Sequence, residues 1–543
     1  MVGVITGSRS PLGPKQQRRK PPSGGTALLG MGCTLAMALT ACAVGPNYHP
    51  TRPTLASFHN APDGSTTAGE PTRLDEWWLA FNDPNLTRIV QRALDQNLDL
   101  AASLARVTQA RAAASAAGAN LLPTADLNAQ AAALRQSLDS PIGEIAKNFP
   151  GYSRDQRLYD VGAQASWEID LFGGLRRTAQ AARAEAQAAE AERLGTRISV
   201  SADSADAYLQ VRGDQARLIV AEKQIDVDSR LLDLVRQRRA RGVASDREVA
   251  QADALLQQAR TTIPLLRIDL EAQLNRLDVL MGAQPGTYAK ELATAADVPA
   301  IPVISSGDRP LDVLRRRPDV IAAERQVAAA NARIGVAISD YYPKISLSGV
   351  LGFESLAGSN LFSARAFQPV GTGALRWRLF DFGKVSAEVA AARGADAEAL
   401  ARYRQSVLRA AEDVEDAFVT LVQTELRTRE LEDEVASLTR ARDLSQQSYV
   451  AGVIPLTDVL DSDRQLLAAR DDLAHTQADA ARAAVRTFRA LGGGWSSESL
   501  AYLVGGHIIF GGFNYDTHEQ YDFDHRRWQR HRLRTYQTTH GIW

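Results

Sequence analysis

Residues 242–249 read GVASDREV and residues 452–459 read GVIPLTDV, so one glycine-containing stretch occurs twice at an offset of 210 residues. The same offset holds without a gap for more than a hundred positions. A repeat of this length predicts two structurally equivalent halves within one architecture. Four pairs of residues mark the offset: Trp167 with Trp377, Gly173 with Gly383, Gly242 with Gly452, and Gly282 with Gly492.

A long proline-free stretch precedes each of the two glycine turns, Gly242 and Gly452. One stretch begins at Gly173 and the other at Gly383, 69 residues before each turn. If helical throughout, each is about 100 Å long, too long for a buried core helix, so it requires partners along its sides. The other expected helices lie at about 84–118, 245–281, 318–339 and 456–491.

Four shorter segments alternate between polar and apolar residues, at about 124–131, 159–170, 344–354 and 372–379. A period of two places such side chains on opposite faces of a sheet. One face could contact lipid and the other a water-filled lumen, or the segments could be ordinary half-buried strands. In lipid, four strands cannot close a barrel, and open edges leave backbone groups unpaired. A transmembrane sheet would therefore be shared, and three copies would supply twelve strands.

The N-terminal residues have the pattern of a bacterial lipoprotein signal. A basic region with Lys15 and Arg18 precedes an apolar stretch at 26–41, which ends in Leu39-Thr40-Ala41-Cys42. This pattern predicts cleavage before Cys42, which would carry diacylglycerol and an N-acyl lipid. The alternative is an ordinary signal peptide with a chance cysteine. No later segment has 18 consecutive apolar residues, so a transmembrane helix is not expected.

Composition and motifs argue against an enzyme or a nucleic-acid-binding protein. The 62 Lys and Arg residues balance 63 Asp and Glu residues, so the chain lacks the excess of positive charge that is typical of nucleic-acid-binding proteins. We find no phosphate loop, no His-Glu-x-x-His motif and no cysteine nucleophile outside the signal region. His518 and His525 lie near Asp522 and Asp524, but their spacing matches no metal site, so neither a metal nor another cofactor is expected.

These patterns divide the chain into five parts. We expect a signal peptide at 1–41, a lipidated segment at 42–82, the first repeat at 83–300, the second repeat at 301–496 and an atypical tail at 497–543. The fold class is that of an α+β membrane protein with an internal two-fold repeat.

Several motifs resemble those of the TolC-like outer membrane factor family, the outer-membrane lipoprotein subunits of tripartite efflux pumps. The resemblance implies a trimeric, 12-stranded β-barrel with four strands per chain, continued by a long α-helical barrel through the periplasm. It also implies docking to a periplasmic adaptor and an inner-membrane pump of the RND type. The motifs are Ala43-Val44-Gly45-Pro46-Asn47-Tyr48, Trp77-Trp78, Asp83-Pro84, Arg317-Pro318-Asp319, Tyr342-Pro343, Phe380-Asp381-Phe382-Gly383 and Gly492-Gly493-Gly494-Trp495.

The same resemblance implies a gate at the two glycine turns. Asp458 and Asp461 match the family's two constricting aspartates, and Tyr449 matches its gate tyrosine. Glu248 stands where the family can carry an acidic partner for that tyrosine, so a hydrogen bond between the two is expected. Ile454 departs from the pattern, because some members carry an arginine there. Alternatively, the two aspartates are exposed carboxylates near the start of a helix.

Three functions remain open on these grounds. The favoured one is a passive outer-membrane channel of an efflux pump, lipid-anchored and extending into the periplasm. An outer-membrane outlet of a type I protein secretion system would use the same fold. A soluble or periplasmic coiled-coil scaffold is the alternative from another class.

Overall fold

The computed structural model describes residues 43–50, 56–60, 73–304 and 310–496. The expected signal peptide, Cys42 and the tail from residue 497 lie outside the described residues. The helices and strands below belong to one compact unit that ends at Trp495. No helix among the described residues is long and apolar enough to cross a membrane.

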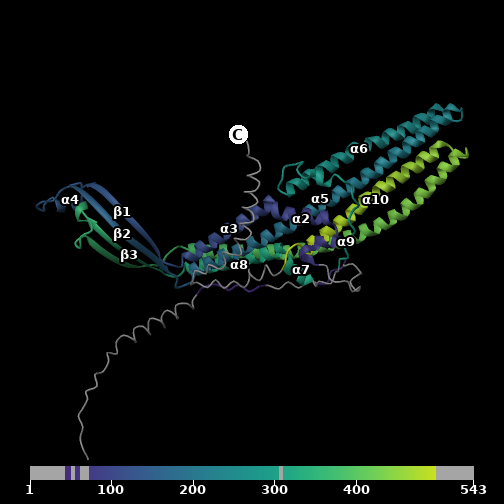
Figure 1. Ribbon diagram of the computed structural model, residues 1–543. Helices are drawn as coiled ribbons and strands as arrows, with labels where there is room; N and C mark the ends of the chain where they lie inside the picture. The colour runs from purple at the N-terminus through teal and green to yellow at the C-terminus, as the bar shows by residue number, and fades with distance from the viewer. Residues whose placement is uncertain (1–42, 51–55, 61–72, 305–309, 497–543) are drawn as a thin grey trace, which may run out of the picture. The chain divides into compact units, whose positions relative to one another are not determined.

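The four alternating segments form one antiparallel sheet in the order β1-β2-β3-β4 (Figure 1). Its strands are β1 (Thr124–Arg135), β2 (Asp155–Ile169), β3 (Lys344–Ser355) and β4 (Phe367–Arg376). The prediction for the fourth segment extended too far, because Trp377 and Leu379 follow the end of β4. The connection between β1 and β2 contains the short helix α4 (Pro141–Ala146).

The strand register places residues of one kind opposite each other across all four strands. Leu127 lies opposite Ala163, Ala163 opposite Leu351, and Leu351 opposite Pro369. On the other face, the row Thr124, Ser166, Ser348 and Thr372 is entirely polar. The sheet therefore has one mainly apolar face and one mainly polar face, and most of its residues are exposed.

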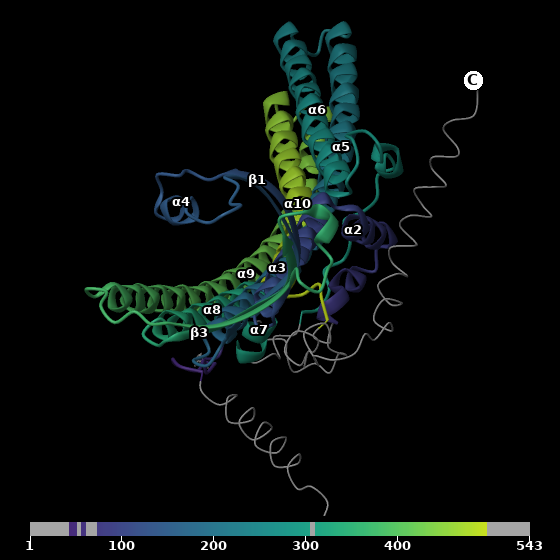
Figure 2. The same ribbon diagram turned by 90° about the vertical axis from the view of Figure 1, so that its left-hand side faces the viewer.

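The second half of the chain repeats the long helices of the first half at equal length. Helices α5 (Gly174–Ala240) and α9 (Lys384–Val450) have 67 residues each, and α6 (Asp246–Leu280) and α10 (Leu456–Ala490) have 35 each. Each long helix leaves the sheet and returns through a glycine turn, so α5 and α6 form one hairpin and α9 and α10 the other (Figures 1 and 2).

The helix expected at 84–118 is two helices, α2 (Pro84–Gln96) and α3 (Leu98–Ala119). Asn97 causes the break, because its side chain accepts hydrogen bonds from the backbone N–H groups of Asp99 and Leu100 and so caps α3. In the second half, α8 (Pro318–Ser339) precedes β3 as expected. Shorter elements complete the unit: η1 (Leu74–Phe81), η2 (Ala289–Leu292), α7 (Pro310–Arg316) and η3 (Gly358–Asn360).

The largest apolar core lies where η1 and α2 pack against α5, α6 and α10. The Trp77 ring stacks on Phe488 at 5.3 Å, and Asp83 caps α2 and accepts a 2.5 Å hydrogen bond from the buried Tyr208 hydroxyl. Trp495 donates through its indole N–H to the Arg316 carbonyl. Several motifs that carry the family resemblance thus make structural contacts within the single chain.

Candidate functional site

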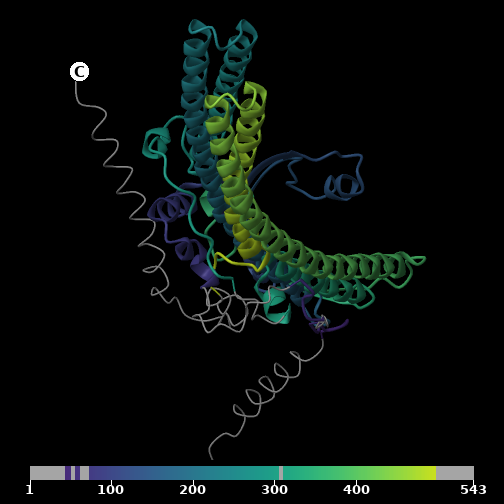
Figure 3. The same cartoon turned by 90° about the vertical axis from the view of Figure 1, so that its right-hand side faces the viewer.

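Two glycine turns end the helical hairpins on the side away from the sheet (Figures 1 and 3). Gly242 has a φ of 74° and Gly452 a φ of 78°, both in the left-handed region that favours glycine. No atom lies within 4 Å of where a Cβ would stand at either position, so backbone conformation and not crowding requires the glycine.

Next to these turns, residues from all four helices of the two hairpins form a small apolar core, which we call the tip core. Its buried members are Leu231, Leu232, Val235, Ala252, Leu255, Leu256, Tyr449, Leu456, Val459 and Leu460. Ile454, at the position of the family's occasional arginine, packs against this core as a partly buried side chain. An apolar contact therefore stands here in place of an ionic one.

Tyr449 is buried in the tip core beneath an arginine of the other hairpin. The Arg238 guanidinium lies over the Tyr449 ring at 4.6 Å and donates a 3.1 Å hydrogen bond to the Val450 carbonyl. Sequence reasoning missed Arg238, which no pattern distinguishes from its neighbouring arginines. The Tyr449 hydroxyl has no hydrogen-bond partner within the described chain.

The expected hydrogen bond between Glu248 and Tyr449 is absent within the single chain, so that prediction was wrong. The Glu248 carboxylate instead accepts from the backbone N–H and hydroxyl of Ser245, while its own N–H donates to the Ser245 hydroxyl. This reciprocal pair is the capping box at the start of α6. Burial and then the negative charge of Glu248 raise the pKa of Tyr449, while the positive charge of Arg238 opposes this shift.

Asp458 and Asp461 are exposed on α10, while Val459 and Leu460 between them face the tip core. Asp458 accepts only from the neighbouring Thr457 hydroxyl at 3.3 Å, and Asp461 from the Gln465 amide at 2.8 Å. Neither carboxylate pairs with a cation in the described part of the chain. Both are therefore available to act outside the single chain.

A second pair of aspartates in the same region is buried, and sequence reasoning missed it. Asp228 of α5 and Asp463 of α10 lie just beyond the tip core. Asp463 accepts a 2.8 Å hydrogen bond from the Arg442 guanidinium of α9. The sequence did indicate that Asp463 is buried, because it occupies a position in the helical spacing of the apolar residues Leu456, Val459 and Leu466 along α10.

The junction between sheet and helices holds the first described residues of the chain. The buried Arg177 of α5 donates to the carbonyls of Val44 and Gly45 and to the side chain of Asn47. The Val44 N–H donates to the Phe172 carbonyl at 3.0 Å, next to the end of β2. The segment that follows Cys42 is thus attached at the strand–helix junction.

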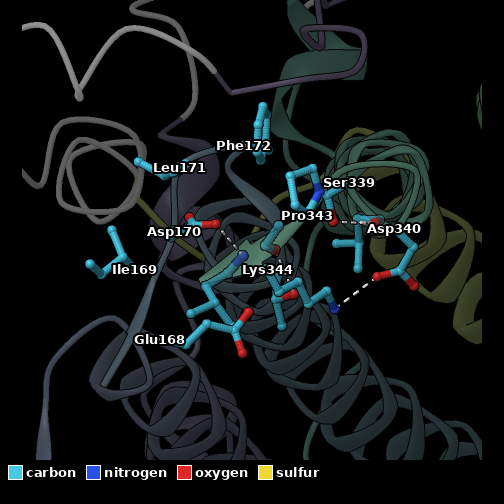
Figure 4. A pocket seen from close by; sticks show the side chains of 13 residues that line it. Glu168, Ile169, Asp170, Leu171, Phe172, Ser339, Asp340, Pro343 and Lys344 are labelled. Carbon is cyan, nitrogen blue, oxygen red and sulfur yellow. Dashed lines mark hydrogen bonds and ion pairs between the residues drawn. The ribbon is translucent and has the colours of Figure 1, made fainter. Parts of the chain in front are cut away.

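Figure 4 shows a pocket at this junction, lined by the end of β2, the start of β3 and helices α5 and α8. Lys344 pairs with Asp340 at 2.8 Å, and the Asp170 carboxylate accepts from the backbone N–H of Arg176 at the start of α5. We assign this pocket no ligand. Among the described residues, no group of three or more His, Cys, Asp or Glu is arranged to hold a metal ion.

The profile of the family described as "Outer membrane efflux protein" matches residues 89–283 and 310–493, more than half of the chain. The chain belongs to the outer membrane efflux protein family. This family consists of outer-membrane channel components, and no enzyme family is indicated. Its outer-membrane location follows from the same membership.

Curated relatives cover most of the chain. The pyoverdine export outer membrane protein OpmQ of Pseudomonas putida is 33% identical over 468 residues, which span 86% of this chain and 97% of OpmQ. The toluene efflux pump outer membrane protein TtgF of Pseudomonas putida is 31% identical, over 87% and 98% of the two chains. Nodulation protein T of Rhizobium leguminosarum is 28% identical over 86% and 98%.

Solved structures share the fold. The outer-membrane channel OprN matches with a TM-score of 0.75 and 33% identity, over 84% of this chain and 100% of OprN. The Campylobacter jejuni CmeC outer membrane channel matches with a TM-score of 0.76 at 22% identity, over 85% and 98% of the chains. The recognition of a TolC-like family from sequence motifs is therefore confirmed.

Proposed function

We propose that three copies of this chain form the outer-membrane channel of a tripartite efflux pump, a passive conduit for small molecules. One observation carries this proposal: the sheet has an apolar face, a polar face and two edge strands, β1 and β4, whose outer edges pair with no other strand among the described residues. Within hydrocarbon, each unpaired backbone group costs several kcal/mol, so the edges require strands from other copies. Three copies supply twelve strands, with the apolar face toward lipid and the polar face toward a lumen.

The two helical hairpins extend this conduit into the periplasm. The exposed side of α9 carries apolar side chains along its length, among them Leu408, Val419 and Leu444. In a trimer these side chains contact the next copy, and the hairpins of three copies surround one tunnel. The tips then dock to a periplasmic adaptor, which connects the channel to an inner-membrane pump of the RND type.

The relatives support small organic molecules as the exported class. OpmQ is named for pyoverdine export and TtgF for toluene efflux. No catalytic step is assigned to this chain, so the energy for export comes from the pump. Deleting its gene is expected to raise intracellular accumulation of a pump substrate, and plasmid-borne wild-type chain should reverse the effect.

Lipidation of Cys42 fits the position of the residues that follow it. Ala43 lies against Gly173 at the strand–helix junction, so an acyl chain on Cys42 would begin at the proposed membrane surface. Cys42→Ser should abolish labelling by a radioactive fatty acid. The barrel should still insert, because twelve strands bury far more apolar surface than acyl chains. Equal labelling of both proteins would exclude this anchor.

Asp458 and Asp461 form the proposed constriction. Three copies would bring six exposed carboxylates around one axis, where a narrow mouth strengthens their attraction for cations. Changing both residues to Ala should lower the cation selectivity of single channels in planar bilayers. Asp443→Ala, which removes an exposed carboxylate of α9, is the matched control. Unchanged selectivity in the double variant would place the constriction elsewhere.

Two neighbouring strand residues test the two faces of the sheet. Leu127→Arg places a charge on the apolar face and should cost about 2–4 kcal/mol if that face contacts the centre of a bilayer. Asn128→Arg places the same charge on the polar face and should leave the trimer in outer-membrane fractions. If both variants assemble equally well, the sheet does not have the proposed orientation.

A further inference from the structure

Helix α5 packs along α10, so the two hairpins share a continuous contact that we call the hairpin seam. Two ion pairs cross it with matched charges: Arg217 with Asp471 at 2.8 Å, and Arg482 with Asp206 at 2.8 Å. Closer to the turns, the seam ends in the tip core. Any separation of the hairpins at their tips must open this part of the seam.

Asp228 and Asp463 interrupt the pattern of matched charges. Asp228 is 1% exposed and Asp463 is 2% exposed. Each has one satisfied oxygen, since Asp228 Oδ1 accepts from the Gln224 amide at 2.8 Å and Asp463 Oδ1 from Arg442 Nε at 2.8 Å. The Oδ2 atom of each is buried and has no partner within the described chain. Buried polar atoms are almost always paired, so these two require an explanation.

The charges around the pair do not balance when both carboxylates are ionised. Among the described residues, the charged groups that act on Asp228 are Asp463 of α10 and Arg442 of α9, and α6 contributes none. Arg442 also pairs with the exposed Asp443 of its own helix. Two buried anions thus face one cation, and one added proton makes the buried set neutral.

We propose that Asp228 carries a proton in the packed hairpin seam, and that this proton holds the two hairpins together near the turns. The proton neutralises one of the two buried carboxylates and leaves the other, Asp463, paired with Arg442. Loss of the proton leaves an uncompensated buried charge, which favours separation of α5 from α10 and entry of water.

The raised pKa of Asp228 supports this proposal. Burial and, less strongly, the charge of Asp463 raise the pKa of Asp228 to about 6, against the opposing effects of Gln224 and Arg442. Because the pKa is raised in the packed state, the proton stabilises the seam at low pH, and this stabilisation is lost as pH rises through 6. We take Asp228 to have its usual pKa once the hairpins separate and water reaches it. The equilibrium constant that favours the packed state over the separated state then falls about ten-fold between pH 5 and pH 7.

Hydrogen exchange of the full-length protein tests this inference without requiring a channel. In wild type, amides of residues 224–235 should lose about ten-fold in protection between pH 5 and pH 7, after correction for intrinsic exchange. Asp228→Asn should keep its pH 5 protection at pH 7, because the amide is neutral throughout. Asp226→Asn removes an exposed carboxylate of the same helix and should behave as wild type.

A second variant distinguishes the protonation of Asp228 from an effect of packing alone. Asp463→Asn removes the negative charge that raises the pKa of Asp228, so the transition should move to lower pH. An identical pH dependence in wild type and Asp228→Asn would overturn the inference. So would a transition that Asp463→Asn leaves in place or moves to higher pH.

The consequence for gating rests on the proposed channel function. Channels in planar bilayers should spend more time closed at pH 5 than at pH 7, and Asp228→Asn should remove the difference. Absence of any conductance in wild type would refute the channel and not the proton on Asp228, which the exchange experiment decides.

Discussion

Helices α5 and α9 have the same length and occupy the same place in the repeat, yet their surroundings differ. Leu209 of α5 is 0% exposed, whereas Val419, its counterpart in α9, is 41% exposed. Ile198 is 5% exposed and its counterpart Leu408 is 60% exposed. Helix α5 packs against α2, α3, α6, α8 and α10, while α9 packs mainly against α8 and α10 (Figures 2 and 3).

The repeat therefore sets the helices and strands of each half but not how deeply they are buried. An apolar side chain in α5 stabilises the single chain, whereas the corresponding side chain in α9 is exposed and contacts another copy in the proposed trimer. Making the same change in both helices tests this difference.

The largest difference is expected from a lysine at the position shared by Ile198 and Leu408. Ile198→Lys would bury an ammonium group without a partner and should cost several kcal/mol, enough to prevent folding. Leu408→Lys should leave the helical circular dichroism of the chain unchanged but shift trimers toward monomers on sizing columns. If the trimer tolerates Leu408→Lys, α9 does not form part of the proposed interface.

A smaller difference is expected from truncating Leu209 and Val419 to Ala. Leu209→Ala creates a cavity in the core and should lower the free energy of unfolding by about 2–5 kcal/mol. Val419→Ala in separated chains should cost less than about 1 kcal/mol, because that side chain is already in water. Urea unfolding in detergent measures both, and equal losses would contradict the difference in burial.

The smallest effects are expected where the two long helices meet, at the tip core. Arg238→Ala removes the contact over the Tyr449 ring and the hydrogen bond to the Val450 carbonyl, a loss of about 1–2 kcal/mol. Tyr449→Phe should be neutral or stabilise by up to about 1 kcal/mol, because the hydroxyl has no partner in the single chain. Hydrogen exchange of residues 445–450 compares the two. Faster exchange in Tyr449→Phe would show that the hydroxyl is bound in the assembled protein.

Patterns local in sequence predicted most of the fold. The strand positions followed from a period of two, and the long helices from proline-free stretches between glycines with positive φ. The break at Asn97 was missed because an asparagine within an alanine-rich stretch is compatible with helix until its side chain caps the next turn. The strand end at Arg376 was missed because the alternation continues past it.

The candidate site was predicted less completely than the fold. Motif matching located Asp458, Asp461 and Tyr449 near the turns, where the structure has them, though their roles stay predictions. It paired Glu248 with the wrong partner, because a serine three residues earlier in the chain competes for the same carboxylate. It did not find Arg238 or the buried pair of Asp228 and Asp463.

The two-fold repeat, the length of each hairpin and the two faces of each strand can be read from the sequence, because they depend on backbone preferences and periodicity along one chain. Which of two equivalent helices is buried, and which charges lack a partner, became visible only in the folded chain. Burial and charge compensation depend on neighbours from other parts of the chain. Asp463 meets Arg442 within its own hairpin, but it faces Asp228 only when the two hairpins pack together.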